Sequence, residues 1–229
     1  MHKPPKIKIF VPAAGFGTRV GSPPAKEMLF LKSNNEMILK ERLIDQIFIL
    51  QKMLDAEVIV ITREDKIELI DYLKNKKDIS TLIIKASKEW PETLLKVADS
   101  FGQQNLLYLP DTRFQPIAIV VKMLEELEHF PLVLAAFSPP DLDKFGCFLI
   151  NNQNHRLFEK PAADYIQKHA HQLMAWGLLA FRGEIGLELF EKLLSSTLNK
   201  REEICSFTFK YHLLDEFKDL SRDGRDLHF

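Results

Sequence analysis

The chain has 229 residues, 46% hydrophobic and 28% charged, which is enough to fold as one large domain around a substantial core. Its 31 basic and 32 acidic residues are spread along the sequence and give a net charge of −1, which argues against a nucleic-acid binder. No apolar stretch approaches the ~20 residues of a membrane span, and Cys147 and Cys205 have no Cys-x-x-Cys partner, so we expect no membrane anchor, zinc site or disulfide framework.

The N-terminal residues MHKPPK are basic, but the short apolar run that follows them has the character of a first strand rather than of a signal peptide. We therefore expect a cytoplasmic protein. Short β-branched runs predict strands at residues 7–12, 57–62, 81–85, 105–109 and 132–137. Segments with helical spacing lie between them, at residues 37–54, 64–75, 92–101 and 115–128. In the last helix we expect a buried stripe made of Ile117, Val120, Val121, Leu124 and Leu127.

After Pro139 the sequence predicts strands at residues 145–150, 155–159 and 174–181 and a helix at 184–194, whereas the tail from residue 201 gives no clear pattern. Alternating strands and helices indicate an α/β fold with a Rossmann-like, mostly parallel mixed sheet flanked by helices. The sequence contains no repeat and no Pro/Gly-rich linker, so residues 1–229 are expected to form a single domain with two halves, 1–138 and 139–229.

The first predicted strand leads into the turn PAAGFGTRVGSPPAKEMLFL, which carries several glycines and two cations. It is not a P-loop, because G-x-x-x-x-G-K-[ST] is absent. It is a poor dinucleotide fingerprint, because the third glycine is one residue late and the second strand ends more than 40 residues after Gly17. Gly15 and Gly17 would let the main chain approach a phosphate, Arg19 offers a planar fork of donors, and Lys26 is a compact charge. The turn therefore predicts a triphosphate site, with a tight turn that binds no ligand as the alternative.

The pattern G-x-G-T-R followed by P-x-K-E-x-L resembles the sugar-1-phosphate nucleotidyltransferases, such as glucose-1-phosphate thymidylyltransferase and its uridylyl relatives. Further motifs in the same order extend the resemblance over nearly the whole chain: YLPDTRF, KFGCFLINNQNHRLFEKP, WGLLAF and FKDLSRDGRDL. The resemblance implies a GT-A-like nucleotide-binding half, a smaller sugar-binding β lobe, and Mg²⁺-dependent condensation of a nucleoside triphosphate, dTTP or UTP first, with a sugar-1-phosphate. It implies no nucleic-acid or membrane partner and is compatible with a homo-oligomer.

The resemblance also implies roles for individual residues. Nucleotide-binding positions are Ala13, Ala14, Gly15, Gly17, Thr18, Arg19, Glu92 and Thr93; sugar-phosphate positions are Gly146, Glu159, Lys160 and Gly177; metal ligands are Asp111 and Asp219; and the catalytic cations are Arg19, Lys26 and Lys160.

The chain departs from the family pattern at two places. Glu92 stands where the family usually has the glycine of Pro-x-Gly-Thr, and Asp219-Leu-Ser stands where Asp-x-Gly is usual, which makes Asp223 a rival metal ligand. These departures keep open a catalytically inactive homologue that retains the nucleotide pocket. A cytidylyltransferase for another phosphorylated alcohol also stays open, because such enzymes share the loop with glycines, Arg and Lys.

Overall fold

A computed structural model describes residues 7–15, 25–31, 41–139, 141–150, 156–159, 161–199, 208–220 and 227–228. Within these residues one sheet has nine strands; seven run in the order β11-β7-β10-β5-β1-β3-β4, and β8 and β9 extend the sheet from β10. The strands are β1 (Lys8–Pro12), β3 (Glu57–Thr62), β4 (Ile79–Ile83), β5 (Gln104–Leu107), β7 (Leu132–Phe137), β8 (Gly146–Leu149), β9 (Arg156–Glu159), β10 (Leu173–Arg182) and β11 (Phe209–Leu213).

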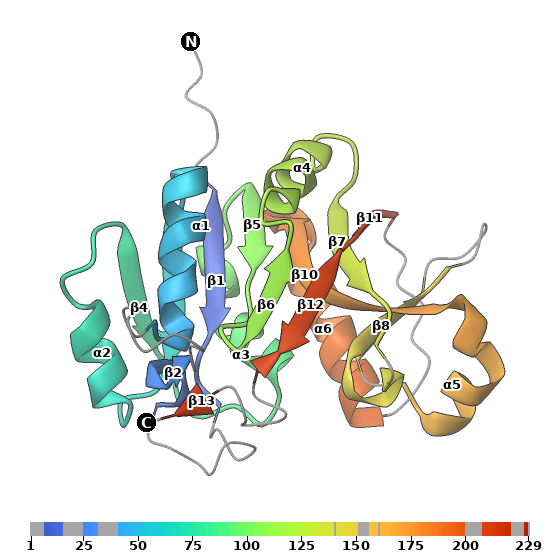
Figure 1. Ribbon diagram of the computed structural model, residues 1–229, viewed down its shortest axis with the longest axis horizontal. Helices are drawn as coiled ribbons and strands as arrows, with labels where there is room; N and C mark the ends of the chain where they lie inside the picture. Colours follow the sequence, from blue (N-terminus) through green and yellow to red (C-terminus); the bar gives the residue numbers. More distant parts are fainter. Residues whose placement is uncertain are drawn as a thin grey trace.

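The sheet is mixed but mostly parallel. β1 pairs in parallel with β3 and β5, β3 with β4, and β7 with β11, whereas β10 runs antiparallel to β5, β7 and β8. The carboxyl ends of β1 and β5 consequently meet at the same edge of the sheet, the lower edge in Figure 1. Open α/β sheets bind their ligands at this edge.

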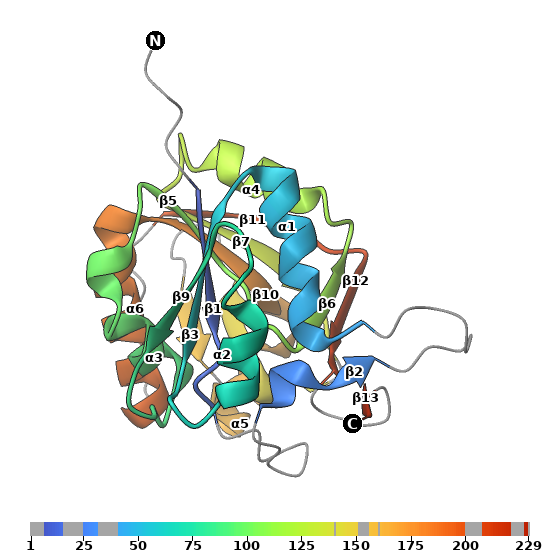
Figure 2. The same ribbon diagram turned by 90° about the vertical axis from the view of Figure 1, so that its left-hand side faces the viewer.

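Helices cover both faces of the sheet, as Figure 2 shows. One face carries α1 (Gln46–Leu54), α2 (Ile67–Leu73) and α4 (Ile119–Glu126), and the other carries α3 (Trp90–Leu95) and α6 (Gly183–Asn199). The short helix α5 (Ala163–His169) packs beside β8 and β9. Single 3₁₀ turns complete the helical elements: η2 (Lys26–Met28), η3 (Leu43–Asp45), η4 (Ala98–Ser100), η5 (Leu142–Lys144) and η6 (Ala170–Gln172).

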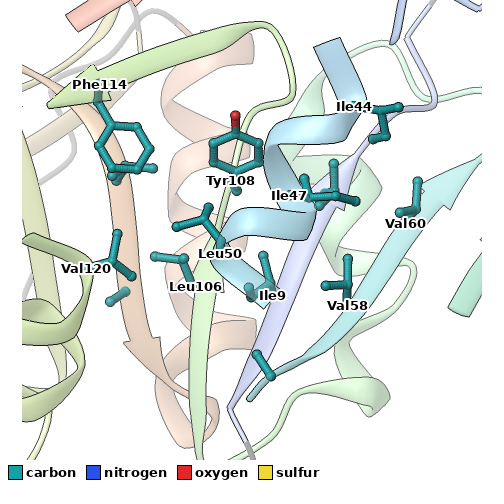
Figure 3. Close-up of a cluster of buried hydrophobic side chains, with 14 of the residues drawn as sticks. Ile9, Ile44, Ile47, Leu50, Val58, Val60, Leu106, Tyr108, Phe114 and Val120 are labelled. Atoms are coloured by element: carbon teal, nitrogen blue, oxygen red, sulfur yellow. The ribbon is translucent and has the colours of Figure 1, made fainter. Parts of the chain in front are cut away.

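Strand periodicity divides the core between the two faces. One hydrophobic cluster lies on the face covered by α1 and α4 and contains Ile9, Val11, Leu106 and Tyr108 (Figure 3). A second cluster lies on the opposite face and contains Phe10 together with Phe190 of α6. Successive side chains of a strand alternate between faces, so a run that is apolar at every position has to be covered on both sides. Both clusters are fully buried, which fixes the register of the central strands.

Two small ribbons lie beside the carboxyl edge of the main sheet. β6 (Thr112–Gln115) pairs antiparallel with β12 (Glu216–Asp219), and β2 (Phe30–Leu31) pairs antiparallel with β13 (Leu227–His228). Both ribbons join the C-terminal part of the chain to segments that come much earlier in the sequence.

The predicted α/β class, with a mostly parallel mixed sheet flanked by helices, is confirmed. The predicted strands at 57–62 and 132–137 have the observed bounds, and the strand predicted at 81–85 begins two residues earlier. The helix predicted at 37–54 begins only at Gln46, because Arg42 bridges Phe30 in extended conformation; residues 37–40 lie outside the described part. β6, β12, β13, β2 and α5 were not predicted.

The expected stripe on the helix at 115–128 is partly wrong. Only Gln115 belongs to β6, and α4 begins at Ile119, so Ile117 precedes the helix and is 37% exposed. Val121 is 38% exposed, because one residue in a helix turns about 100° away from the buried Val120. Ile119 and Met123 complete the buried stripe with Val120 and Leu124, as the four-residue spacing requires. No helix in the described ranges is both long and apolar enough to cross a bilayer.

Candidate functional site

The candidate site lies where β1 and β5 end. Ala13 and Ala14 follow β1 and are buried, and the main-chain N–H of Ala13 donates to the Ile61 carbonyl of β3 at 2.8 Å. Gly15 is exposed, and a Cβ added to it would meet nothing within 4 Å. Packing against the described residues therefore does not explain this glycine.

Lys26 reaches this edge from η2, and Asp111 reaches it from the turn between β5 and β6. The Lys26 ammonium lies 2.6 Å from Asp111 Oδ2, although the two residues are 85 positions apart. Their side chains are 18% and 13% exposed, so the ion pair is partly screened from water while remaining accessible. The structure thus brings a predicted catalytic cation and a predicted metal ligand into direct contact.

Asp219 lies beside Asp111 because β12 pairs with β6. Asp219 is opposite Thr112 in the ribbon, and the N–H of Leu220 donates to the Asp111 carbonyl at 2.8 Å. This pairing brings together the main chains of two aspartates that are more than 100 residues apart in the sequence, and both raise the pKa of Lys26. Among the residues that the structure describes, no group of three or more His, Cys, Asp or Glu side chains could hold a metal ion, and the metal-binding role of Asp111 and Asp219 stays a prediction.

The charges at the site act on one another. Burial lowers the pKa of Lys26, but Asp111, Glu27 and Asp219 together raise it by more, and the net pKa lies above the ordinary value. The ammonium is therefore the stable form. The ammonium is thus held among the carboxylates of Asp111, Glu27 and Asp219, which favour its charged form.

A buried ion pair that the sequence did not predict lies directly behind Lys26. The Lys66 ammonium lies 2.8 Å and 3.1 Å from the two oxygens of Glu27 and donates to the Ala13 carbonyl at 2.6 Å. The Lys66 and Glu27 side chains are 1% and 0% exposed. Burial lowers the pKa of Lys66 and Glu27 raises it, with a net lowering. A lysine at the start of a helix is usually a solvated residue, so the sequence carries no signal for this arrangement.

Glu92 and Thr93 lie in the first turn of α3. Thr93 is buried, and the Glu92 carboxylate accepts the Lys88 main-chain N–H at 3.0 Å and pairs with Lys96 at 2.9 Å. The hydrogen bond from Lys96 is the main reason that the pKa of Glu92 is lowered. These contacts are local to the start of the helix, where a carboxylate is favoured. The nucleotide-binding role of Glu92 stays a prediction.

The predicted sugar positions Gly146 and Glu159 are opposite each other on β8 and β9. Glu159 is buried. A Cβ on Gly146 would lie 2.3 Å from the Trp176 ring, and a Cβ on Gly177 would lie 2.1 Å from the Phe217 ring. Gly177 also coincides with a bulge between Trp176 and Leu178 in β10. Both glycines therefore have packing reasons of their own, and their contact with a sugar stays a prediction.

Several predicted positions fall outside the described residues: Gly17, Thr18, Arg19, Lys160 and the rival ligand Asp223. Within the described part, Lys26, Asp111 and Asp219 converge, with Ala13 behind them, while Gly146, Glu159 and Gly177 belong to the β8, β9 and β10 region.

A separate groove of about 810 Å³ lies between α1 and the β6–β12 ribbon. Its lining mixes charged and apolar side chains, among them Gln46, Arg113, Ile117 and Lys218. None of the predicted site residues lines it. The predicted site therefore lies at the carboxyl edge and does not include this groove.

No protein-family model and no curated protein matches the sequence. The fold, however, is similar to that of solved proteins. A structure assigned to glucose-1-phosphate thymidylyltransferase from Bacillus anthracis, in complex with sucrose, matches with a TM-score of 0.72 at 14% identity over 97% of each chain. Mannose-1-phosphate geranyltransferase from Thermus thermophilus matches with a TM-score of 0.64 at 15% identity, over 94% of this chain and 76% of that one.

A third similar fold is 4-diphosphocytidyl-2C-methyl-D-erythritol synthase from Anaerococcus prevotii, with a TM-score of 0.55 at 14% identity over 92% of this chain and 87% of that one. At these identities the likeness establishes the fold and nothing finer. The chain has a nucleotidyltransferase-like α/β fold, as the sequence predicted.

Proposed function

We propose that the chain is a nucleotidyltransferase that joins a nucleoside triphosphate to a sugar-1-phosphate and releases pyrophosphate. The triphosphates that we favour are dTTP and UTP. The observation that carries this proposal is the convergence of Lys26, Asp111 and Asp219 at the carboxyl edge, beside the glycine turn that follows β1. The likeness in fold to proteins whose names include sugar-1-phosphate transferases gives it further support.

In the proposed reaction a phosphate oxygen of the sugar-1-phosphate attacks the α-phosphorus of the triphosphate. A new oxygen–phosphorus bond forms while the bond to the bridging oxygen of the β-phosphate breaks, and pyrophosphate leaves with that electron pair. The nucleophile is already ionised, so no general base is needed. The demand on the protein is to hold two anions together and to stabilise the charge that builds up on the α-phosphoryl group.

The chain offers residues for this task. Lys26 would leave Asp111 and pair with the α-phosphate and the incoming sugar phosphate, as a compact ammonium can. Main-chain N–H groups of the glycine turn, starting at Gly15, would bind the triphosphate, and Arg19 would bind its β- and γ-phosphates. Glu159 would accept from sugar hydroxyls, and Lys160 would pair with the sugar phosphate.

Asp111 and Asp219 fit a Mg²⁺ ion, because Mg²⁺ prefers oxygen ligands and is commonly held by one or two carboxylates together with substrate phosphates. Asp111 directly precedes β6 and Asp219 ends β12, so the pairing of these two strands would supply such a pair of carboxylates. When bound, Mg²⁺ would supply charge neutralisation for the triphosphate. We expect the protein to act in the cytoplasm on these two small substrates.

A second candidate is a cytidylyltransferase for another phosphorylated alcohol. One observation favours it: the space over the Cα atoms of Gly146 and Gly177 is taken by aromatic rings, which reduces the room next to the predicted sugar positions. The similarity to a diphosphocytidyl-methylerythritol synthase fold is in line with this alternative. Both candidates use the same triphosphate site and differ in the acceptor.

The experiment that tests the proposal measures pyrophosphate release from five nucleoside triphosphates, each with a panel of sugar-1-phosphates and with methylerythritol phosphate, in the presence of Mg²⁺. Release above background with a sugar-1-phosphate, lost in Lys26→Met, is the expected result. Release only with CTP and the alcohol phosphate selects the second candidate. Binding of a triphosphate with no release from any pair contradicts both and leaves a nucleotide-binding protein without this activity.

A further inference from the structure

The Lys66 ammonium makes three contacts in a place where water does not reach it. Oxygen atoms of Glu27 and Ala13 lie 2.6–3.1 Å from Lys66 Nζ, and this number of acceptors matches its three N–H donors. Moving a charged pair out of water is costly, so a buried pair is tolerated only where its hydrogen bonds are satisfied. The satisfaction of Lys66 requires the main chain at Ala13 as well as the Glu27 carboxylate.

These two partners flank the predicted phosphate-binding turn. Ala13 is the first residue after β1, and Glu27 directly follows Lys26, so the turn at residues 14–26 begins and ends at partners of one ammonium. Ala13 is also fixed by its N–H bond to Ile61. Both ends of the turn are therefore anchored to the β3–α2 junction, to which Lys66 belongs as the residue that precedes α2.

Glu27 and Lys26 are neighbours in the 3₁₀ turn η2 but point to different partners. Glu27 points to Lys66, and Lys26 points to Asp111. Successive residues of a 3₁₀ turn are rotated by about 120°, so fixing the side chain of Glu27 inward sets the direction in which Lys26 leaves the turn. The buried pair thereby orients the cation that the proposed reaction requires.

We propose that Lys66 is a positioning residue, which holds the two ends of the phosphate-binding turn together through Ala13 and Glu27 and directs Lys26 toward the triphosphate. This inference rests on the proposed function, because it presumes that the turn binds phosphate. Lys66 itself does not touch substrate, since its side chain is 1% exposed and its donors are occupied.

The test compares the wild type with the double variant Lys66→Met/Glu27→Met. Replacing a buried ion pair by apolar side chains of similar volume is often neutral for stability, so the double variant is expected to fold while losing the link to Ala13. The matched control is Lys74→Met, an exposed lysine that follows α2. The probe is inorganic tripolyphosphate with Mg²⁺, followed by isothermal titration calorimetry, because tripolyphosphate is the part common to all nucleoside triphosphates.

We expect the double variant to bind tripolyphosphate about tenfold more weakly than the wild type, a difference of about 1.4 kcal/mol, and Lys74→Met to bind normally. With the substrates found by the release screen, kcat should fall by a similar or larger factor, while KM for the acceptor changes less than twofold. A residue that only supports folding would leave both values unchanged in a folded variant.

A folded double variant that binds tripolyphosphate like the wild type would overturn the positioning role and leave the proposed function intact. A wild type that does not bind tripolyphosphate would instead remove the phosphate site and this inference with it. If the double variant does not fold, Glu27→Gln decides, because it keeps the shape of the side chain and removes the charge. It should bind several-fold more weakly, and wild-type binding in Glu27→Gln would overturn the inference.

Discussion

Replacing Lys26 by Met and Asp111 by Asn, singly and together, separates the stabilising role of this ion pair from its role in turnover. The ammonium and the carboxylate are 2.6 Å apart and mostly buried. A hydrogen bond between charged groups contributes about 1.5–3 kcal/mol in such a setting. The double-mutant cycle should therefore give a coupling energy of about 1–3 kcal/mol in the free protein.

The assay for the first role is urea unfolding of the four proteins without ligand. Each single variant should lose about 2 kcal/mol, equivalent to a melting temperature lower by about 4–8 °C in a domain of this size. Lys144 and Asp141 form the matched control, because their atoms are also 2.6 Å apart but their side chains are 51% and 52% exposed. Exposed pairs of this kind couple by about 0.2–1 kcal/mol.

The assay for the second role is pyrophosphate release at saturating substrate. Lys26→Met should lower kcat about 100-fold or more, since one well-placed donor on a developing oxyanion is worth ~3 kcal/mol. The double variant should be no more active than Lys26→Met. A coupling energy no larger than that of the Lys144–Asp141 control would refute the stabilising role of the Lys26–Asp111 pair. Turnover near the wild-type value in a folded Lys26→Met would refute the catalytic role of Lys26.

Three further predictions test other parts of the molecule. Gly177→Ala should lower the free energy of unfolding by about 1–3 kcal/mol, because the added Cβ would lie 2.1 Å from the Phe217 ring. Gly15→Ala should change it by less than about 0.5 kcal/mol, because the added Cβ would meet nothing within 4 Å. Equal effects of the two variants in urea unfolding would contradict this account. Burial raises the pKa of the Cys147 thiol to about 12, so at pH 8 its thiolate fraction should be about 1,000-fold below that of the unfolded chain. The rate of alkylation by iodoacetamide, followed by mass spectrometry, should be lower by the same factor. Rapid labelling of the native protein would show that Cys147 is not buried. Asp219→Asn should abolish Mg²⁺-dependent pyrophosphate release while Asp223→Asn does not, and the reverse result would move the second ligand to Asp223.

The sequence predicted the central strands because their burial is nearly continuous. Residues 57–62 and 132–137 are mostly apolar and rich in β-branched or aromatic side chains, and short runs of this kind are typical of strands covered on both faces. The short strands β6 and β12 carry no comparable pattern; their identity comes from pairing with each other across about 100 residues. No local signal in either segment specifies that partner, which is why the tail could not be predicted.

The candidate site likewise has residues that the sequence could predict and contacts that it could not. Lys26 and Asp111 could be nominated from motifs, since glycines and cations after a strand favour phosphate and an aspartate at a strand end favours a metal. Their direct contact could not be predicted, because it depends on how η2 is held against the sheet. Lys66 could not be nominated, because nothing in the sequence distinguishes a buried lysine at a helix start from an exposed one.

The arrangement of charge accounts for the stability of the proposed site for two anionic substrates when neither is bound. Lys26 and Lys66 would repel each other at the carboxyl edge, and each lowers its repulsion by pairing with a carboxylate, Asp111 in front and Glu27 behind. The rear pair is buried and also binds the main chain, so its exchange with a ligand would leave charges unsatisfied. The front pair is more accessible than the rear pair, and in the proposed reaction its partners would be exchanged for phosphate and metal. Under the proposed function, the same edge would therefore contain one ion pair that fixes the turn and one that takes part in the chemistry, and the difference in burial would separate the two roles.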